Sequence, residues 1–373
     1  MRTGISETLL RWLCGDRTSS AAVPICVALL STLVSSAALL ALGHDPVTAM
    51  AAFLRGSGLM PKPSYAGGQS MLTDFMSYLG ILAPMMLASL SVIFCLKAGM
   101  FNIGVSGQML AAGFLATALV GYAKLPSGAA RPLVVLIGAA VGGLMGAAVG
   151  YLKYLFNIHE VVSCIMINHI TSYVTGFFID TRYVDVITRS SRACSASSRL
   201  TIAGVRMGGV RAAIPLGILI AITAVFVVRF LMERTTAGFG IKIVGLNRDA
   251  ARYAGVPVGR SYVFAMSIGG ALAGLAGVTY YLGYYNSIVP KALPSLGYDA
   301  IAVALLGNLS PPAAVFSSML VTIFQKGGVY MSSVTGAPRE IASVVIALLL
   351  LFSACGAYIR ERARSALGKR GGG

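Results

Sequence analysis

The chain has 373 residues, of which 57% are hydrophobic and only 11% charged, and its mean hydropathy is +0.81. A soluble domain of this length needs far more charge to cover its surface, so the composition predicts a protein that lies in a lipid bilayer. A formal net charge of +17 raises the alternative of nucleic-acid binding. The Lys and Arg residues lie between long apolar runs, however, without an aromatic-interleaved basic face, which is typical of the ends of membrane helices. We therefore expect membrane lipid and no nucleic acid as a partner.

Ten apolar segments are predicted to cross the membrane. A hydrocarbon core about 30 Å thick needs roughly 20 apolar residues in helical form. One run, 298–309, is shorter and ends in Ser-Pro-Pro, which breaks a helix, so it is either a tilted helix that also uses 293–297 or a half-helix. The predicted fold class is all-α and polytopic, with segments at residues 23–43, 78–96, 101–122, 132–151, 161–179, 214–232, 261–283, 298–309, 313–329 and 341–358.

Ten segments place both termini on the same side of the membrane. A cytoplasmic location for both gives the inside loops a small excess of Lys and Arg, and the excess becomes clear once the arginine-rich outside loop 180–212 is set aside. Residues 1–22 are polar, and the run after them is long enough to span, which predicts an uncleaved anchor. The predicted parts are a cytoplasmic segment 1–22, a transmembrane domain 23–359 and a basic cytoplasmic tail 360–373.

Glycine and cysteine have structural interpretations in this chain. Gly138, Gly142 and Gly146 recur at helical spacing in one segment, and Gly270 and Gly274 do so in another. Small residues three or four apart let helix backbones approach closely. The six cysteines show neither CxxC nor Cys/His ligand spacing, so we expect no disulfide framework and no metal site. The P-loop pattern GxxxxGK[ST] is absent, so this chain does not bind ATP by a P-loop.

The first polar constellation is residues 101–108, FNIGVSGQ, between the second and third segments. Asn102, Ser106 and Gln108, together with two glycines, occupy the entry of an otherwise apolar helix. A polar, glycine-interrupted helix start can leave backbone N–H groups free for a ligand, as in transporters with broken helices. The alternative is a capped helix end at the interface, with Asn102 as the N-cap. The residues alone do not separate these two interpretations.

The second constellation is residues 247–255, NRDAARYAG, between the sixth and seventh segments. Asn247 is a good N-cap, Asp249 is favoured in the first turn by the helix dipole, and Gly255 is a plausible stop. This pattern predicts a short helix on the cytoplasmic face. With Ala250 and Ala251 on its faces, such a helix fits a groove on another protein, and an ordinary amphipathic connector is the alternative.

Four sequence blocks resemble the permease subunits of ABC importers for simple sugars and nucleosides, in the branched-chain amino-acid/ribose-type permease superfamily. They are 101–108 (FNIGVSGQ), 160–168 (EVVSCIMIN), 244–255 (VGLNRDAARYAG) and 297–307 (GYDAIAVALLG). The resemblance covers most of the chain, from about residue 87 to residue 350, and is strongest to the nucleoside-type branch. It implies a non-enzymatic transport subunit in a bacterial inner membrane.

The resemblance also implies roles and partners. Residues 233–260 would form the coupling loop of the permease domain, and its short helix would dock in the ATPase subunit, which alone binds ATP and Mg²⁺. Further partners would be a second permease subunit, identical or paralogous, and a periplasmic or lipoprotein solute receptor. The coupling helix would comprise Asn247, Asp249, Ala250, Ala251, Arg252, Tyr253 and Gly255, and the block 101–108 would place Asn102, Ser106 and Gln108 near the substrate path. Apart from that implied placement, other polar residues could contact the solute on the path, and these are Asn168, His169, Tyr281 and Asp299.

Two of the path residues have simpler alternatives. Tyr281 belongs to a group of tyrosines at a helix end, where an interfacial aromatic belt is common. His169 could hydrogen-bond a neighbouring helix. It also stands where the family commonly has Tyr, and Ser106 stands where the family usually has Glu. These departures leave open a purine nucleoside, riboflavin or a ribose-type sugar as the solute.

Two other classes of membrane protein fit the sequence less well. A secondary transporter driven by protons or sodium often keeps an acid at mid-membrane, whereas nearly all 12 Asp and Glu residues fall at segment ends or in loops. A channel for a small polar solute is the related alternative. An integral-membrane enzyme needs a nucleophile–base pair or a metal-ligand group, and the sequence shows neither.

Overall fold

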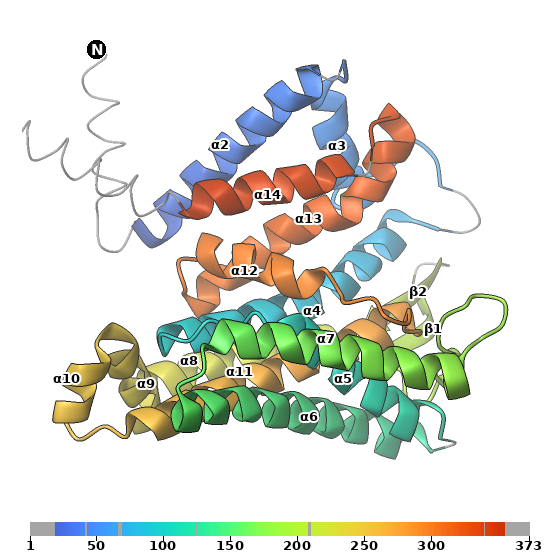
Figure 1. The fold of residues 1–373 in the computed structure, drawn as a ribbon. Coiled ribbons are helices and arrows are strands. Elements are labelled where there is room, and N and C mark those ends of the chain that lie inside the picture. Colours follow the sequence, from blue (N-terminus) through green and yellow to red (C-terminus); the bar gives the residue numbers. More distant parts are fainter. Residues whose placement is uncertain are drawn as a thin grey trace, which may run out of the picture. The chain divides into compact units, whose positions relative to one another are not determined.

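The computed structural model describes residues 19–41, 43–65, 69–123, 125–207, 210–338 and 340–354. Within these ranges the chain is mostly helical, and its sheet is one antiparallel hairpin (Figure 1). The elements in chain order are α2 (Ser19–Ala41), α3 (Pro46–Gly56), α4 (Met71–Lys97), α5 (Val105–Ala116) with the π-helical turn η1 (Thr117–Gly121), α6 (Ser127–Phe156), α7 (Glu160–Phe178) with η2 (Ile179–Tyr183), β1 (Thr201–Met207), β2 (Val210–Pro215), α8 (Gly217–Arg234), α9 (Thr236–Leu246), α10 (Arg248–Tyr253), α11 (Val258–Val278) with η3 (Thr279–Tyr285), α12 (Leu296–Leu306), α13 (Pro311–Thr335) and α14 (Glu340–Ala354).

Several of these helices are suited to a bilayer. Among the described residues, α4, α6, α7 with η2, and α11 with η3 are each long and apolar enough to cross a membrane. A further broken span is formed if Leu29–Ala41 and Pro46–Gly56, which meet at a bend of 118°, are counted together. The predicted all-α membrane fold is confirmed. The total of ten segments and the cytoplasmic termini stay predictions.

One predicted segment needs correction, and for another the structure favours one of its two alternatives. The segment expected at 101–122 starts as a helix only at Val105, because the backbone before it is irregular. The short run expected at 298–309 is α12, which has 11 residues, and Asn308 after it has a φ of +49°. Eleven helical residues are too few to span a bilayer, so the structure agrees with the half-helix alternative. Residues 1–18 and 355–373, which include most of the N-terminal segment and all of the basic tail, lie outside the described residues.

Helix α3 was not predicted from the sequence. Asp45 is its N-cap and accepts hydrogen bonds from the backbone amides of Val47 and Thr48, at 3.2 and 3.0 Å. Pro46 occupies the first helical position, where its fixed φ suits a helix and its missing N–H costs nothing. An Asp-Pro pair ahead of an apolar run is a helix-start signal, and this signal was available in the sequence.

The hairpin β1–β2 occupies the end of the loop expected at 180–212, and β2 extends to Pro215, into the segment expected at 214–232. Its two strands pair antiparallel, with Thr201 opposite Pro215 and Met207 opposite Val210. The sequence between the strands is Gly-Gly, flanked by residues such as Val205 and Val210, which is a recognised hairpin signal. The hairpin and α10 lie at opposite ends of the helices α6 and α11 (Figure 1).

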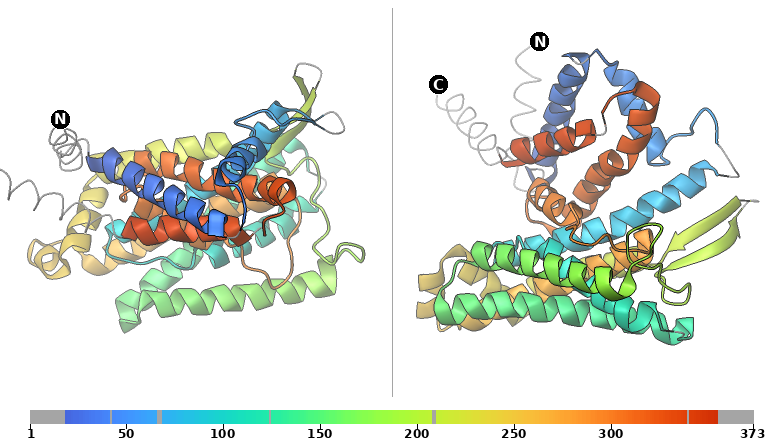
Figure 2. Two further views of the ribbon diagram at one scale, coloured as in Figure 1. Left: turned by 90° about the horizontal axis from the view of Figure 1, so that it is seen from above. Right: turned by 45° about the vertical axis from the view of Figure 1, so that its right-hand side comes forward.

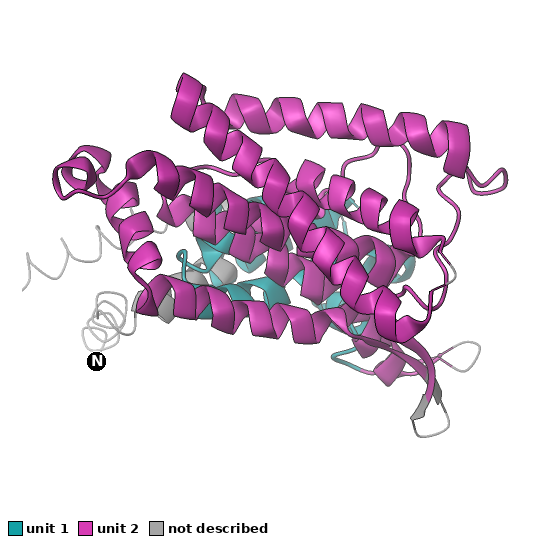
Figure 3. Cartoon of the chain, turned by 90° about the horizontal axis from the view of Figure 1, so that it is seen from below, with its two compact units in different colours: residues 1–60, 301–373 teal, residues 61–300 magenta. Residues whose placement is uncertain are grey.

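The chain divides into two compact units, Met1–Met60 with Ile301–Gly373, and Pro61–Ala300 (Figure 3). In the first unit α3 packs against α13 and α2 packs against α14. Phe53 meets Phe324 edge to face, with ring centroids 5.2 Å apart. A Cβ added at Gly327 would collide with the backbone of Phe53, so glycine allows α3 and α13 to approach this closely.

The second unit is built around the contact of α6 with α11, two helices that run side by side (Figure 2). A Cβ at Gly142 would collide with the carbonyl oxygen of Gly270, and one at Gly146 with that of Met266. A Cβ at Gly274 would likewise collide with the carbonyl oxygen of Gly138. The predicted glycine groove between packed helices is therefore confirmed.

We expect Gly146→Leu to prevent this packing and to lower the amount of folded protein in the membrane at least tenfold. Forcing a side chain into a filled space costs about 1–3 kcal/mol in typical cores, and here the obstacle is backbone. Gly128→Leu is the matched control, because Gly128 lies on the same helix with nothing within 4 Å of an added Cβ. Membrane yield and thermal stability of the two variants give the comparison, and equal values would contradict the groove.

A broken helix entry and a short exposed helix as the candidate functional site

The connection between α4 and α5 is a sharp break in the helical backbone. Gly99 follows the end of α4 with a φ of +73°, and the Met100 amide donates to the carbonyl oxygen of Cys95 at 3.0 Å. This bond pattern is the Schellman end of a helix, which requires a residue that tolerates the left-handed region. Residues 98–104 are non-helical and mostly buried. Irregular backbone in a membrane protein needs protein partners for its polar groups.

Asn102 supplies several of these partners. Its Oδ1 accepts from the Gly104 amide at 3.0 Å, and its Nδ2 donates to Gln108 Oε1 at 3.0 Å and to Ser91 Oγ at 3.3 Å. Gln108 Nε2 donates back to Asn102 Oδ1 at 3.4 Å. Asn102 and Gln108 are both completely buried. The two side-chain amides therefore fix the start of α5 against α4.

Asn168 of α7 also hydrogen-bonds to the backbone around the start of α5. Its Oδ1 accepts from the Gly107 amide at 2.9 Å, and its Nδ2 donates to the carbonyl oxygen of Ile103 at 3.1 Å. Ser106 Oγ donates to the carbonyl oxygen of Pro294 at 2.9 Å, which joins α5 to the segment ahead of α12. We call Asn102, Ser106, Gln108 and Asn168 the polar joint. It connects three helices and a distant loop through buried hydrogen bonds.

The polar joint bears on the two interpretations of residues 101–108. The amides of Gly104 and Gly107, at the start of α5, already donate to Asn102 and Asn168. They are not free for a ligand in this conformation. Asn102 also does not cap an exposed helix end, because it is buried and the N-cap position is Gly104. The helix is broken at this point, as the first interpretation expects, but its backbone amides already have hydrogen-bond partners within the protein.

The other predicted path residues lie apart from the joint. His169 follows Asn168 on α7 but is exposed rather than buried, and Ile170 beside it is 60% exposed. Tyr281 is only 6% exposed, and its ring lies against Gly113 of α5. Asp299 is half-buried in the first turn of α12. Tyr281 is thus a packing residue within its unit, whereas His169 faces outward.

The segment 247–255 forms the short helix α10. Asn247 Oδ1 accepts from the amides of Asp249 and Ala250, both at 3.0 Å. Gly255 ends the helix with a φ of +78°, and its amide donates to the carbonyl oxygen of Arg252 at 3.0 Å. The predicted cap and stop are therefore both present. The helix between them has six residues, and a helix of this length is not stable in isolation.

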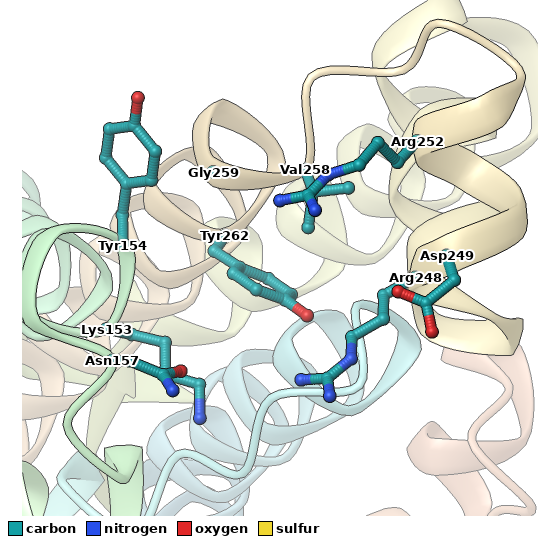
Figure 4. A pocket seen from close by; sticks show the side chains of 9 residues that line it. All are labelled: Lys153, Tyr154, Asn157, Arg248, Asp249, Arg252, Val258, Gly259 and Tyr262. Carbon is teal, nitrogen blue, oxygen red and sulfur yellow. The ribbon is translucent and has the colours of Figure 1, made fainter.

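Only one face of α10 contacts its own unit. Ala251 is completely buried, whereas Ala250 is exposed and Tyr253 is 94% exposed. A large aromatic side chain in this position is typical of a protein-binding surface. Arg252, which the sequence grouped with the docking residues, lines a pocket between α10 and the ends of α6 and α11 (Figure 4). The outward surface of α10 is consequently formed by Ala250 and Tyr253.

The end of α9 connects α10 with the broken helix entry. A Cβ at Gly245 would collide with the carbonyl oxygen of Lys97, the last residue of α4. Gly99 faces the same point, and a Cβ there would lie 3.4 Å from the Cα of Gly245. The two glycines therefore allow direct backbone contact two residues before the cap of α10. Sequence reasoning missed this contact, because nothing in a single sequence pairs residue 245 with residue 97.

Comparison with known proteins identifies the type of protein that carries this site. The chain is 32% identical over 91% of its length to the nucleoside ABC transporter permease protein NupB of Lactococcus lactis subsp. cremoris, of which it covers 92%. It is 35% identical over 75% of its length to the guanosine ABC transporter permease protein NupP of Bacillus subtilis, of which it covers 80%. It is 25% identical over 88% of its length to the probable riboflavin import permease protein RfuC of Treponema pallidum, of which it covers 84%.

A family model agrees with these relatives. The model for the permease component of the branched-chain amino acid transport system matches residues 75–354, well over half of the chain. The match contains the broken helix entry, the polar joint and α10. The resemblance seen in the four sequence blocks is therefore confirmed. The chain belongs to this family of ABC transporter permeases, as a multi-pass protein of the bacterial inner membrane and a subunit of an ABC importer.

Proposed function

We propose that this permease imports a purine nucleoside and is driven by an ATPase that binds α10 on the cytoplasmic side. The observation that carries the substrate class is the likeness to nucleoside and guanosine permeases over most of the chain. The observation that carries the coupling role is the capped, outward-facing helix α10. ATP and Mg²⁺ are bound by the ATPase, and this chain supplies the path and the docking helix.

The structure suggests how motion passes from the ATPase to the path. Closure of the ATPase subunits displaces α10, and α9 moves with it because Asn247 joins the two helices. Gly245 then displaces the end of α4 through its backbone contact with Lys97. This contact lies directly before residues 98–104, the irregular entry of α5. A break in a helix is where a small change of backbone angles gives a large change of direction.

In this mechanism the start of α5 has two conformations, and the hydrogen bonds of the polar joint stabilise one of them. Asn102 and Gln108 hydrogen-bond each other, and Asn168 hydrogen-bonds the backbone of Ile103 and Gly107, so the three side chains orient α5 and α7 rather than contact solute in this conformation. Rearrangement of the joint would release the amides of Gly104 and Gly107 for a ligand. His169 and Asp299 are the path candidates outside the joint.

The partners follow from the family. We propose two permease subunits, identical or paralogous, around a central path, two ATPase subunits on α10, and a solute receptor at the opposite end, where the hairpin β1–β2 lies. This arrangement retains ten membrane segments with both termini in the cytoplasm, which requires α12 to complete a crossing together with the non-helical residues on either side of it. The proposed parts are the cytoplasmic segment 1–22, the permease domain 23–359 with its coupling loop 233–260, and the tail 360–373.

Uptake measurements test the substrate class. We expect deletion of the gene for this chain to lower the uptake of labelled guanosine at least tenfold, and the gene supplied in trans to restore it. Labelled riboflavin and ribose are the parallel measurements in the same strains. Unchanged guanosine uptake would contradict the proposal. Loss of riboflavin uptake alone would favour the second candidate, for which the likeness to a riboflavin permease is the supporting observation.

A further inference from the structure

A pocket of about 380 Å³ lies behind α10, between this helix and the ends of two membrane helices (Figure 4). Lys153 and Tyr154 line it from the end of α6, and Tyr262 lines it from the second turn of α11. Arg248 and Arg252 line it from α10. This surface faces the permease itself and is distinct from the outward surface formed by Ala250 and Tyr253.

The pocket has an excess of positive charge. Three cations, Lys153, Arg248 and Arg252, line it with a single carboxylate, Asp249. Lys153 already pairs with Glu160, at 3.1 Å between Nζ and Oε2. Within the described part of the chain, no ion pair joins Arg248 or Arg252 to a carboxylate. The two arginines are therefore the cations that are open to an external anion.

The two arginines also repel each other. They are four residues apart on α10, where like charges destabilise a helix, and Figure 4 shows both guanidinium groups extending into the pocket. An anion with several acceptor oxygens would relieve this repulsion by accepting from both groups. The Tyr262 side chain and the Asn157 amide lie across the same space and offer further donors. These features are those of a phosphate site.

The surroundings of the pocket indicate where the phosphate comes from. The end of α6 beside it carries exposed aromatic and apolar side chains, as expected where a helix leaves the hydrocarbon core. Acyl chains can lie along this surface while a headgroup occupies the pocket. The exposed residues are Tyr151, Tyr154, Leu155, Phe156 and Ile158.

We propose that this pocket binds the headgroup phosphate of an anionic phospholipid from the cytoplasmic leaflet. Basic pockets between membrane helices on the cytoplasmic side are known to take anionic headgroups. The inference rests on the proposed function in one respect, which is that α10 lies at the cytoplasmic surface. A bound lipid would join α10 to the ends of α6 and α11, so the lipid composition would influence how firmly the docking helix is held.

The test measures lipid bound to the full-length chain, purified with its ATPase from membranes containing phosphatidylglycerol. Native mass spectrometry counts the phosphatidylglycerol that stays bound. We expect the double variant Arg248→Gln/Arg252→Gln to weaken retention by about thirty-fold, since each basic residue near an anionic surface contributes about a factor of five. Arg234→Gln/Arg260→Gln is the matched control, because these two arginines are exposed at the same end and do not line the pocket.

Each outcome supports or overturns the inference. Loss of phosphatidylglycerol in the pocket variant alone, with the ATPase still bound, supports it. Equal retention in both variants overturns it, and so does loss of the ATPase with the lipid still bound, which would make the arginines part of the protein interface. Binding of inorganic phosphate by the parent with no phosphatidylglycerol retained would overturn the lipid assignment. A failure of the proposed function is detected separately, by labelling of Ala250 from the outer side.

Discussion

Replacing Tyr253 by Asp is expected to release the ATPase from the permease and to abolish ATP-driven uptake. Tyr253 is 94% exposed in this unit, so the substitution removes no internal contact and should change the stability of the permease by less than about 0.5 kcal/mol. An aromatic anchor at the centre of an interface typically contributes 2 kcal/mol or more, which is about thirty-fold in affinity. A buried carboxylate in its place adds a desolvation cost.

The measurement is the amount of ATPase that co-purifies with tagged permease, together with uptake in whole cells. Ile187→Asp is the matched control, because Ile187 is 91% exposed and lies at the opposite end of the unit, beyond η2. It should leave ATPase binding unchanged. Equal binding of the ATPase by the Tyr253 variant and the parent would show that α10 is not part of the interface.

Replacing Gly245 by Ala is expected to uncouple the importer, so that the ATPase stays bound and hydrolyses ATP while uptake falls at least tenfold. The added methyl group would collide with the carbonyl oxygen of Lys97 and push the end of α9 away from the end of α4. Overpacking of this kind costs about 1–3 kcal/mol, which is enough to shift a two-state equilibrium by roughly five- to a hundredfold. The docking surface at Tyr253 is unaffected.

Gly240→Ala provides the control within the same helix. A Cβ at Gly240 meets only a side-chain methyl group of Val256, at 3.4 Å, so the substitution fits. Both changes raise helix propensity by a similar amount, about 1 kcal/mol, and this common effect cancels in the comparison. ATP hydrolysis and uptake are measured in the same reconstituted vesicles. Full transport by the Gly245 variant would show that the contact with Lys97 does not transmit motion.

Local features of this protein could be predicted from its sequence. The cap and stop of α10 depend on side chains within eight residues of each other, and both Asn247 and Gly255 have the expected geometry. The glycines of α6 and α11 could be predicted as close-packing positions because their spacing is that of one helix face. The apolar membrane helices followed from run length alone.

Contacts between distant residues could not be predicted from one sequence. Asn102 and Asn168 lie 66 positions apart, and only the packing of α7 against α5 brings them to the same helix start. The sequence offered both residues as candidates for the substrate path, and their hydrogen bonds to the amides of Gly104 and Gly107 are visible only in the structure. The role of Tyr281 was uncertain for the same reason, since its burial depends on Gly113 of another helix.

Two missed elements had usable local signals. The Asp-Pro pair at the start of α3 and the Gly-Gly pair in the hairpin both follow known rules for helix starts and hairpin turns, and both lie between the apolar runs on which the predicted spans depend. The bend of 118° between Leu29–Ala41 and Pro46–Gly56 lies at the same place, where Gly43 has a φ of +79°. The length of an apolar run indicates that a segment can cross the membrane, but it does not show where the helix bends.

The most direct test of the central claim is the sidedness of α10. Ala250→Cys, in a chain whose native cysteines are replaced by Ala and which is expressed without its ATPase, is treated with a membrane-impermeant maleimide. The account predicts labelling in inverted vesicles and none in intact spheroplasts, with the reverse result for Ile187→Cys. Labelling of Ala250→Cys in intact spheroplasts would place α10 outside the cell, where no ATPase can reach it, and would contradict the coupling role.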